Sequence, residues 1–248
     1  MTSGILKKRL DVLLVERGLS MSRERAQAMI LTGDVLVNDT PCTKSGTSFP
    51  ENVAIRLRKP DHPYVSRGAL KLERALDEFK IDVTGKVAMD IGASTGGFTQ
   101  ILLLRGAVKV FALDVGHNQM DWSIRTDPRV VCLEKINARS LEYPVIGQKV
   151  DTIVVDVSFI SLRLIFPALI QFMKPETDLI SLIKPQFEAG RSEVGKGGIV
   201  QSEEVYQNVI KTITETAQDL GLIRQSLINS PITGTDGNRE FLAHWRLL

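Results

Sequence analysis

Beyond residue 64 the chain alternates between two kinds of hydrophobic pattern. Apolar residues that recur every three or four positions predict amphipathic helices, and short apolar runs predict strands buried on both faces. The expected helices cover residues 67–79, 98–105, 162–173 and 202–220. The expected strands cover residues 87–90, 108–114, 130–133, 150–156, 178–183, 222–229 and 241–247. This alternation predicts an α/β fold with a doubly wound, mostly parallel sheet of the Rossmann-like kind.

The first part of the chain has a shorter pattern that predicts a small α+β domain. Residues 10–17 have the leucine spacing of a short helix, and the glycine that follows is a typical helix end. Ser22 is placed to cap a second helix, which should end at Gly33. Val35 and Val37, followed by a polar turn at residues 38–41, predict a strand, and Val53, Ile55 and Leu57 alternate with polar neighbours, as is typical of a half-buried strand.

A short proline-containing stretch separates the two patterns. Pro60 and Pro63 restrict the backbone and lack amide donors, which is typical of a linker. We therefore predict a first domain over residues 1–59, a linker over residues 60–64 and a second domain over residues 65–248.

A glycine-rich turn over residues 90–99, between an expected strand and an expected helix, is the main candidate for ligand binding. Ligands of open α/β sheets lie at the carboxyl ends of strands, where glycines allow a close approach. An acidic residue directly before the glycines disfavours a pyrophosphate and suits S-adenosylmethionine, which carries an amino group and a sulfonium. Asp114, which ends the next strand, is expected to accept hydrogen bonds from ribose hydroxyls. The residues expected to contact this cofactor are Asp90, Gly92, Ser94, Gly96, Gly97, Phe98, Asp114 and Asn137.

Four charged residues are expected to converge on the same edge of the sheet: Lys71, Asp156, Lys184 and Glu240. Taken singly, each also fits an ordinary surface charge. Together they suit methyl transfer to a ribose 2′-hydroxyl, which needs in-line alignment and a group that takes up the proton. We expect Lys184 to be that group, Lys71 to favour its neutral form, and the two carboxylates to hold the lysines in place.

Two other methylation chemistries find no support in the sequence. Amino-group methylation often uses an Asn/Asp-Pro-Pro-aromatic motif, and the chain contains none. Carbon methylation of pyrimidines needs a cysteine nucleophile. Cys132 lacks a preceding proline and is predicted to be a core thiol.

Charge and composition restrict the classes of protein further. The net charge is +2, but residues 1–62 hold ten basic and seven acidic side chains, a bias that suits contact with a polyanion. The cysteines Cys42 and Cys132 show no pairing pattern, which suits a reducing compartment. Charged residues interrupt the start of the chain, and no run of about 18 apolar residues occurs. We expect a cytoplasmic protein with no membrane span and no metal.

Several motifs in order carry a resemblance to a known family. They are Val65–Leu72, the turn at residues 90–99, Ala112–Gly116, Asp156–Ser161, Leu182–Glu188, Gly195–Gly198 and Gly237–Phe241. Residues 65–248 resemble the FtsJ-type ribose methyltransferases, and the whole chain resembles the TlyA (hemolysin A) family. Residues 7–59 resemble the S4-type RNA-binding domain through Arg9-Leu10-Asp11 and the Ser22-Arg23-x-x-Ala26 pattern.

The resemblance implies a catalytic tetrad on Lys71, Asp156, Lys184 and Glu240. It also implies a ribosomal RNA or ribosomal subunit substrate, with methylation of cytidine ribose. The residues expected to contact RNA are Arg9, Arg23, Arg25 and Arg67. Two alternatives stay open at this point: a non-catalytic RNA-binding or ribosome-assembly factor, and a haemolysin.

Overall fold

The computed structural model describes residues 7–58, 63–234 and 237–248. The chain forms two compact units, Met1–Pro63 and Tyr64–Leu248. Each unit has its own hydrophobic core, so each is described by itself.

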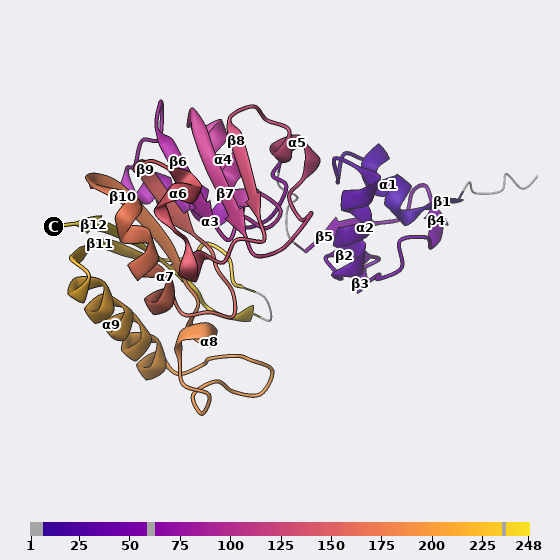
Figure 1. Cartoon of the computed structure of the whole chain (residues 1–248). Helices are drawn as coiled ribbons and strands as arrows, with labels where there is room; N and C mark the ends of the chain where they lie inside the picture. The colour runs from indigo at the N-terminus through magenta and orange to yellow at the C-terminus, as the bar shows by residue number, and fades with distance from the viewer. Residues whose placement is uncertain (1–6, 59–62, 235–236) are drawn as a thin grey trace, which may run out of the picture. The chain divides into compact units, whose positions relative to one another are not determined.

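The N-terminal unit packs two helices against short strands (Figure 1). Its helices are α1 (Leu10–Glu16) and α2 (Arg23–Leu31). Its strands are β1 (Lys7–Arg9), β2 (Val35–Val37), β3 (Thr40–Pro41), β4 (Ser48–Pro50) and β5 (Ile55–Leu57). Strand β1 pairs with β4, and β2 lies between β3 and β5. As predicted, the Ser22 side chain caps the second helix by accepting a hydrogen bond from the Arg25 amide.

The second unit is built on one seven-stranded sheet with the order β11-β12-β10-β9-β6-β7-β8. Its strands are β6 (Val87–Ile91), β7 (Lys109–Asp114), β8 (Val130–Glu134), β9 (Val150–Val155), β10 (Met173–Ile183), β11 (Leu222–Asn229) and β12 (Phe241–Leu247). The neighbouring strands β10, β9, β6, β7 and β8 run parallel to one another, whereas β12 is antiparallel to its neighbours β10 and β11. The predicted mostly parallel α/β sheet is confirmed.

Helices cover both faces of this sheet (Figure 1). They are α3 (Ala69–Phe79), α4 (Gly97–Leu104), α5 (Trp122–Arg125), α6 (Tyr143–Ile146), α7 (Leu162–Leu169), α8 (Pro185–Glu188) and α9 (Glu203–Asp219), with short 3-10 turns at Ala138–Ser140 and Ile170–Phe172. Helices α3 and α4 share a core with Ala88 and Val110, whereas α7 and α9 share one with Met89 and Phe111. Side chains alternate between the faces of a strand, so successive residues of β6 and β7 enter different cores.

One predicted boundary is wrong. A helix was expected over residues 162–173, followed by a strand from residue 178, but the helix ends at Leu169 and β10 already begins at Met173. Met173 is fully buried and pairs with Val150 across an irregularity in β10. Its apolar side chain therefore continues the helical spacing while its backbone already belongs to the sheet. Thr177 stabilises the irregularity because its hydroxyl donates to the Val150 carbonyl and accepts from the Lys174 amide.

Candidate functional site

The carboxyl ends of three adjacent parallel strands create the site. Strand β9 lies between β6 and β10, so the segments that follow these strands leave the sheet side by side. Gly92 follows β6 in a left-handed backbone conformation with φ of +86°. A Cβ atom at this position would overlap the backbone carbonyl oxygen of Asp156, which follows β9. Glycine is required here because the two segments lie in contact.

The four predicted catalytic residues form two ion pairs. Lys184 Nζ lies 2.6 Å from Asp156 Oδ1, in an ion pair that is not aligned as a hydrogen bond. The same Nζ donates a hydrogen bond of 2.9 Å to the Ser158 hydroxyl. Lys71 Nζ donates to Glu240 Oε2 at 2.6 Å. The predicted meeting of lysines and carboxylates at the strand ends is therefore present, with one carboxylate for each lysine.

The Lys71–Glu240 pair is the more deeply buried of the two. Lys71 comes from the first turn of α3, and its side chain is 10% exposed, whereas the Glu240 side chain is 2% exposed. Gly234 lies so close to the Glu240 carboxylate that a Cβ atom there would overlap it. Two charges in such a dry place are favourable only together, so loss of either partner leaves the other uncompensated.

A hollow of about 480 Å³ lies beside the glycine turn, within the usual range for small-molecule sites. Four of the predicted cofactor residues line it: Gly92, Ser94, Asp114 and Asn137. Asp156 also borders this hollow, so it lies between the candidate cofactor space and Lys184. Apolar side chains complete the wall, namely Leu113, Val115, Ile136, Ala138, Val157, Phe159, Ile160 and Ile165.

Asp114, the residue predicted to bind ribose hydroxyls, already accepts hydrogen bonds from two backbone amides. Asp114 Oδ2 accepts a hydrogen bond of 2.7 Å from the Ser94 amide, and Oδ1 accepts one of 2.7 Å from the Gly116 amide. These bonds fix the left-handed turn at Ser94, and the carboxylate, which lines the hollow, keeps lone pairs that can accept further hydrogen bonds. Asn137 uses its side-chain oxygen to accept from the Arg139 amide and keeps its amide donors.

Other predicted cofactor residues lie elsewhere. Asp90 is fully buried and accepts from the Thr99 hydroxyl at 2.7 Å, while its Oδ1 has no partner among the described residues. Burial raises the pKa of Asp90 to about 7, which the Thr99 hydrogen bond opposes and the nearby charge of Asp156 reinforces. Asp90 and Gly96 do not line the hollow, and Gly96 packs against Ile124. Direct contact of Asp90 with a cofactor stays a prediction.

Two further hollows adjoin the same charged centre. One of about 270 Å³ is lined by Arg67, Lys71, Gly97, Phe98 and both members of the Asp156–Lys184 pair, among others. The other, of about 350 Å³, is lined by Ser158, Phe159, Lys184, Gln186, Phe187, Gly198, Asn238 and Glu240. Asp156 therefore borders the first two hollows, and Lys184 borders the last two.

An exposed aromatic residue beside Lys184 was not predicted as part of the site. Phe159 is 89% exposed and adopts a left-handed backbone with φ of 63°, which is rare for a bulky residue. Its ring lies 4.8 Å from that of Phe187, tilted by 49°. Strained, exposed residues cluster at functional sites. The available sequence signal was its position three residues after Asp156 at a strand end.

Asn238 was also quoted only as part of a motif and not as a site residue. Its side-chain oxygen accepts from the Val200 amide at 3.1 Å, and its amide donates to the Gly198 carbonyl at 2.9 Å. It therefore ties the glycine-rich segment before α9 to the segment that carries Glu240.

Glu188 joins the two segments that carry Asp156 and Lys184. Located at the end of α8, it accepts hydrogen bonds from the Ser161 hydroxyl and, at 2.7 Å, from the Leu162 amide at the start of α7. Burial raises the pKa of Glu188, although both hydrogen bonds oppose the shift. This carboxyl group, named the α7–α8 clamp below, holds the segments together without contacting the ion pair.

The predicted RNA-contacting arginines lie in both units. Arg9 and Arg23 are exposed and Arg25 is half-buried in the N-terminal unit, whereas Arg67 is exposed and lines the 270 Å³ hollow of the second unit. In the part of the chain that the structure describes, no group of three or more His, Cys, Asp or Glu side chains is placed to hold a metal ion.

Comparison with known proteins points to the same two units. Residues 64–247 match the model of the FtsJ-like methyltransferases, and residues 8–52 match the S4 domain. The chain is 46% identical over 239 residues to a Bacillus subtilis protein provisionally named rRNA methyltransferase YqxC, covering 96% of this chain and 85% of that protein. It is 43% identical over 236 residues to the 16S/23S rRNA (cytidine-2'-O)-methyltransferase TlyA of Mycobacterium tuberculosis, covering 95% and 88%.

A solved structure supports the fold of the whole chain. A Streptococcus thermophilus protein provisionally described as a hemolysin superposes with a TM-score of 0.78 at 41% identity, covering 98% of this chain and 90% of the other. Within the residues placed by the structure, no helix is long and apolar enough to cross a membrane.

Proposed function

The chain belongs to the FtsJ-like methyltransferase family and carries an S4 domain, and on that basis we propose that it methylates a ribose 2′-hydroxyl of ribosomal RNA with S-adenosylmethionine as the methyl donor. One observation carries the proposal. Asp156 borders the 480 Å³ hollow, Lys184 borders the 350 Å³ hollow, and both border the 270 Å³ hollow, so the ion pair connects the candidate cofactor space with the two hollows that we assign to the target nucleotide.

The residues around the 480 Å³ hollow fit S-adenosylmethionine. Gly92 lines this hollow without a side chain, and the Asp114 and Asp156 carboxylates suit a cofactor with hydroxyl groups and positive charge. We propose that Gly92, Ser94, Asp114 and Asn137 hold it, with Asp114 facing ribose hydroxyls. When bound, the cofactor supplies an electrophilic methyl group on a sulfonium, which leaves as a neutral thioether.

The chain's own residues supply alignment and proton transfer. We assign Lys184, in its neutral amine form, as the acceptor of the 2′-hydroxyl proton, and Asp156 and Ser158 hold the ammonium group that results. The Lys71–Glu240 pair adds a fixed positive group close by, which stabilises negative charge that develops on the ribose oxygen. The exposed ring of Phe159, beside Phe187, offers a stacking surface for the base of the target nucleotide.

The RNA substrate is assigned through the N-terminal unit and the relatives. An S4 domain with exposed Arg9 and Arg23 suits phosphate contacts, and Arg67 brings a further cation to the 270 Å³ hollow. The TlyA relative is named for cytidine 2′-O-methylation of 16S and 23S rRNA, and we propose cytidine as the target here. We place this activity in the cytoplasm, where ribosomal subunits are available.

The test is to incubate the purified chain with separate unmodified small and large ribosomal subunits and methyl-labelled S-adenosylmethionine. Mass spectrometry of nuclease digests should place the label on the 2′-oxygen of a cytidine. Label on a base would contradict ribose methylation. Tight subunit binding without any label would favour the non-catalytic RNA-binding alternative, and lysis of red cells by the pure protein would favour the haemolysin alternative.

A further inference from the structure

A buried carboxylate organises two of the exposed arginines of the N-terminal unit. Arg9 donates two hydrogen bonds to Asp11, from Nε to Oδ1 at 3.0 Å and from Nη2 to Oδ2 at 2.8 Å. Arg23, from the first turn of α2, donates to the same Oδ2 at 3.3 Å, and Gln27 donates to it at 2.7 Å. One carboxylate therefore holds side chains from β1 and from α2.

Burial and exposure divide sharply within this network. The Asp11 side chain is 0% exposed, whereas the side chains of Arg9 and Arg23 are 47% and 53% exposed. Hydrogen bonding from Arg9 holds the pKa of Asp11 well below its usual range, against the opposing effect of burial. The anion is thus hidden beneath the surface, and the two cations that it holds face solvent.

Donors remain available on both arginines. A guanidinium carries five N–H donors, and within the described residues the hydrogen bonds to Asp11 use two of those of Arg9 and one of those of Arg23. Arg9 Nη1 lies against Gly46, where a Cβ atom would come within 3.6 Å of it. The backbone around Gly46 is fixed to α1, since the amides of Leu10 and Asp11 donate to the carbonyls of Thr47 and Ser45. The open, fixed surface around Arg9 suits the close approach of a phosphate backbone.

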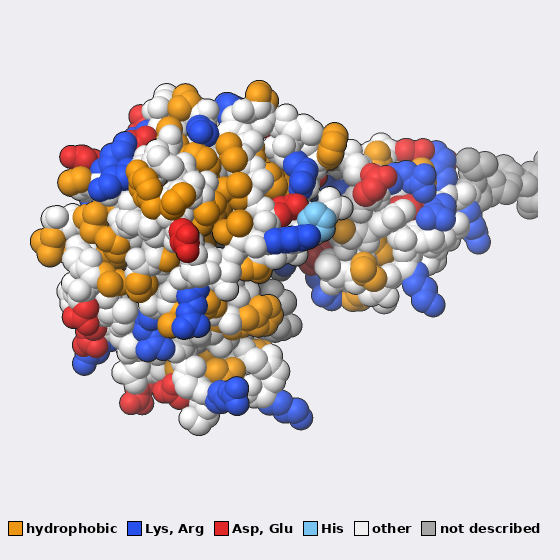
Figure 2. Space-filling model, in the orientation of Figure 1, with side chains coloured by type: hydrophobic (Ala, Val, Ile, Leu, Met, Phe, Trp, Pro, Cys, Tyr) orange, Lys and Arg blue, Asp and Glu red, His pale blue; other side chains and the backbone are white. Residues whose placement is uncertain are grey.

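Other cations of this unit are engaged differently. Basic and acidic side chains are interspersed on its surface (Figure 2). Lys8 pairs with the partly exposed Glu16 and Glu51, and Arg56 pairs with Asp39, whose side chain is 80% exposed. An incoming phosphate near these pairs meets an exposed carboxylate, whereas near Arg9 and Arg23 the carboxylate is covered.

We propose that Asp11 is a positioning residue that fixes Arg9 and Arg23 as a two-armed contact for adjacent phosphates of structured RNA. This inference rests on the proposed function, because it takes ribosomal RNA as the partner. Free arginine side chains lose rotamer freedom when they bind, and a side chain already held by a carboxylate loses less. Asp11 therefore strengthens RNA binding although it is itself negative.

This assignment makes a prediction of opposite sign to simple charge counting. Asp11→Asn removes one negative charge from the N-terminal unit and on charge alone would tighten binding to RNA. Loss of the carboxylate that holds both arginines should instead weaken RNA binding, by about tenfold. Asp39→Asn is the matched control, because it makes the same charge change at an exposed ion pair.

The experiment measures binding of the full chain to the ribosomal subunit that the unmodified protein methylates, at several salt concentrations between about 50 and 200 mM. Asp39→Asn should bind as the unmodified chain does, or more tightly. Asp11→Asn should bind about tenfold more weakly, and in methyl transfer it should raise KM with kcat unchanged. Binding by Asp11→Asn as tight as that of Asp39→Asn would overturn the inference.

A second variant keeps the question decidable if circular dichroism shows that Asp11→Asn does not fold. Arg9→Lys keeps both the positive charge and the Asp11 carboxylate but removes the two-point grip. It should also weaken binding, and unchanged binding would overturn the inference. Failure of the unmodified chain to bind or methylate either subunit would instead refute the proposed function, so the two failures are distinguishable.

Discussion

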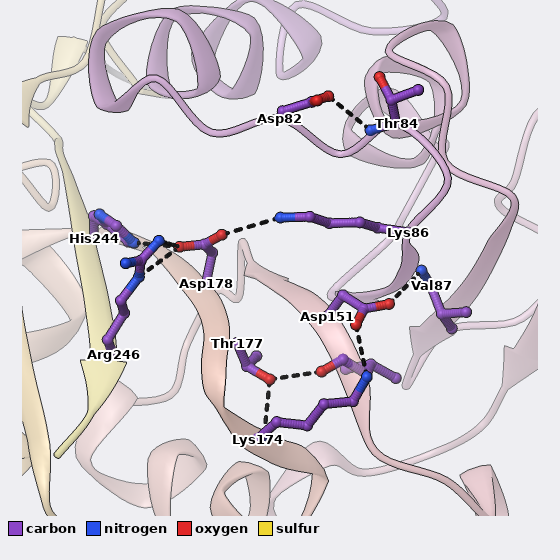
Figure 3. Close-up of polar contacts among 11 residues, drawn as sticks. Asp82, Thr84, Lys86, Val87, Asp151, Lys174, Thr177, Asp178, His244 and Arg246 are labelled. Carbon is purple, nitrogen blue, oxygen red and sulfur yellow. Dashed lines mark hydrogen bonds and ion pairs between the residues drawn. The ribbon is translucent and has the colours of Figure 1, made fainter.

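The two ends of the central sheet use the same kinds of charged residue to different effect. At the carboxyl ends of the parallel strands, Asp156 and Glu240 each face one lysine and border hollows. Toward the amino ends, Asp178 is 3% exposed and accepts from His244 at 2.9 Å and Arg246 at 2.7 Å, with Lys86 at 3.4 Å (Figure 3).

In the cluster toward the amino ends, each carboxylate oxygen of Asp178 and Asp151 accepts at least one hydrogen bond. Asp178 Oδ1 accepts from two side chains and Oδ2 from Lys86. Asp151 Oδ1 accepts from Lys174 at 2.6 Å, and its Oδ2 accepts from the Val87 amide at 2.9 Å (Figure 3). None of these residues lines the three hollows at the other end. A carboxylate whose two oxygens both have partners stabilises the fold, whereas Asp156, which has a single ion-pair partner and borders a hollow, is available for chemistry.

The largest expected effect tests the available cluster. Lys184→Ala should lower methyl transfer by about 10²–10⁴-fold, because it removes the proton acceptor. Binding of S-adenosylmethionine, measured by calorimetry, should persist. Lys174→Ala, which breaks the ion pair of Lys174 with Asp151 at the other end, is the matched control and should keep its activity. Comparable loss of activity in both variants would contradict the assignment of catalysis to the charged residues at the carboxyl ends of the strands.

A pair of glycine substitutions tests the close approach at the carboxyl ends. Gly92→Ala should destabilise the fold by at least about 3 kcal/mol and abolish cofactor binding, since its Cβ would overlap the Asp156 carbonyl oxygen. Gly85, just before Lys86 at the other end, also has a positive φ of 71° but has nothing within 4 Å of an added Cβ. Gly85→Ala should therefore cost only about 1 kcal/mol. Urea unfolding measures both, and equal losses would contradict the proposed overlap.

A smaller effect than that of Gly92→Ala is expected at Asp178, in the cluster toward the amino ends of the strands. Burial opposes ionisation of Asp178, but hydrogen bonds from His244 and Arg246 outweigh it and lower its pKa from 3.8 to about 2. A lowered carboxyl pKa adds stability that is present above the ordinary pKa and is lost as the pH falls through the lowered value. Asp178→Asn should thus lower the free energy of unfolding at pH 7 by on the order of 2 kcal/mol and leave methyl transfer unchanged.

The pH dependence provides the check on this prediction. Between about pH 4 and pH 2, urea unfolding of the unmodified chain should show a loss of stability that is smaller in Asp178→Asn. Parallel pH profiles for the two proteins would mean that Asp178 contributes nothing through its ionised form.

Much of the fold was predictable because hydrophobic periodicity reports burial directly. The strands at Leu222–Asn229 and Phe241–Leu247 have the predicted bounds, and the charged residues that follow β9 and β10 do meet. The early start of β10 was not predictable, because the polar residues after Met173 resemble a turn and only pairing with Val150 makes this segment a strand.

Side-chain partners were the less predictable part of the site. That Lys71 would pair with Glu240, 169 positions away, depends on how α3 packs near the start of β12. The left-handed backbone of Phe159 contradicts local preference, so no propensity could indicate it. The hydrogen bond that buried Asp90 accepts from Thr99 likewise depends on how β6 and α4 pack, so the sequence did not indicate it.

The α7–α8 clamp gives the site a frame that does not depend on its reactive pair. Glu188 ties the loop after β9 to the loop after β10 through Ser161 and Leu162, away from Asp156 and Lys184. Substitution of Asp156 or Lys184 should therefore remove one functional group while the segments after β9 and β10 keep their positions. Small amines supplied in solution to a Lys184→Ala protein should accordingly find a preformed vacancy of the right shape and restore part of the lost turnover.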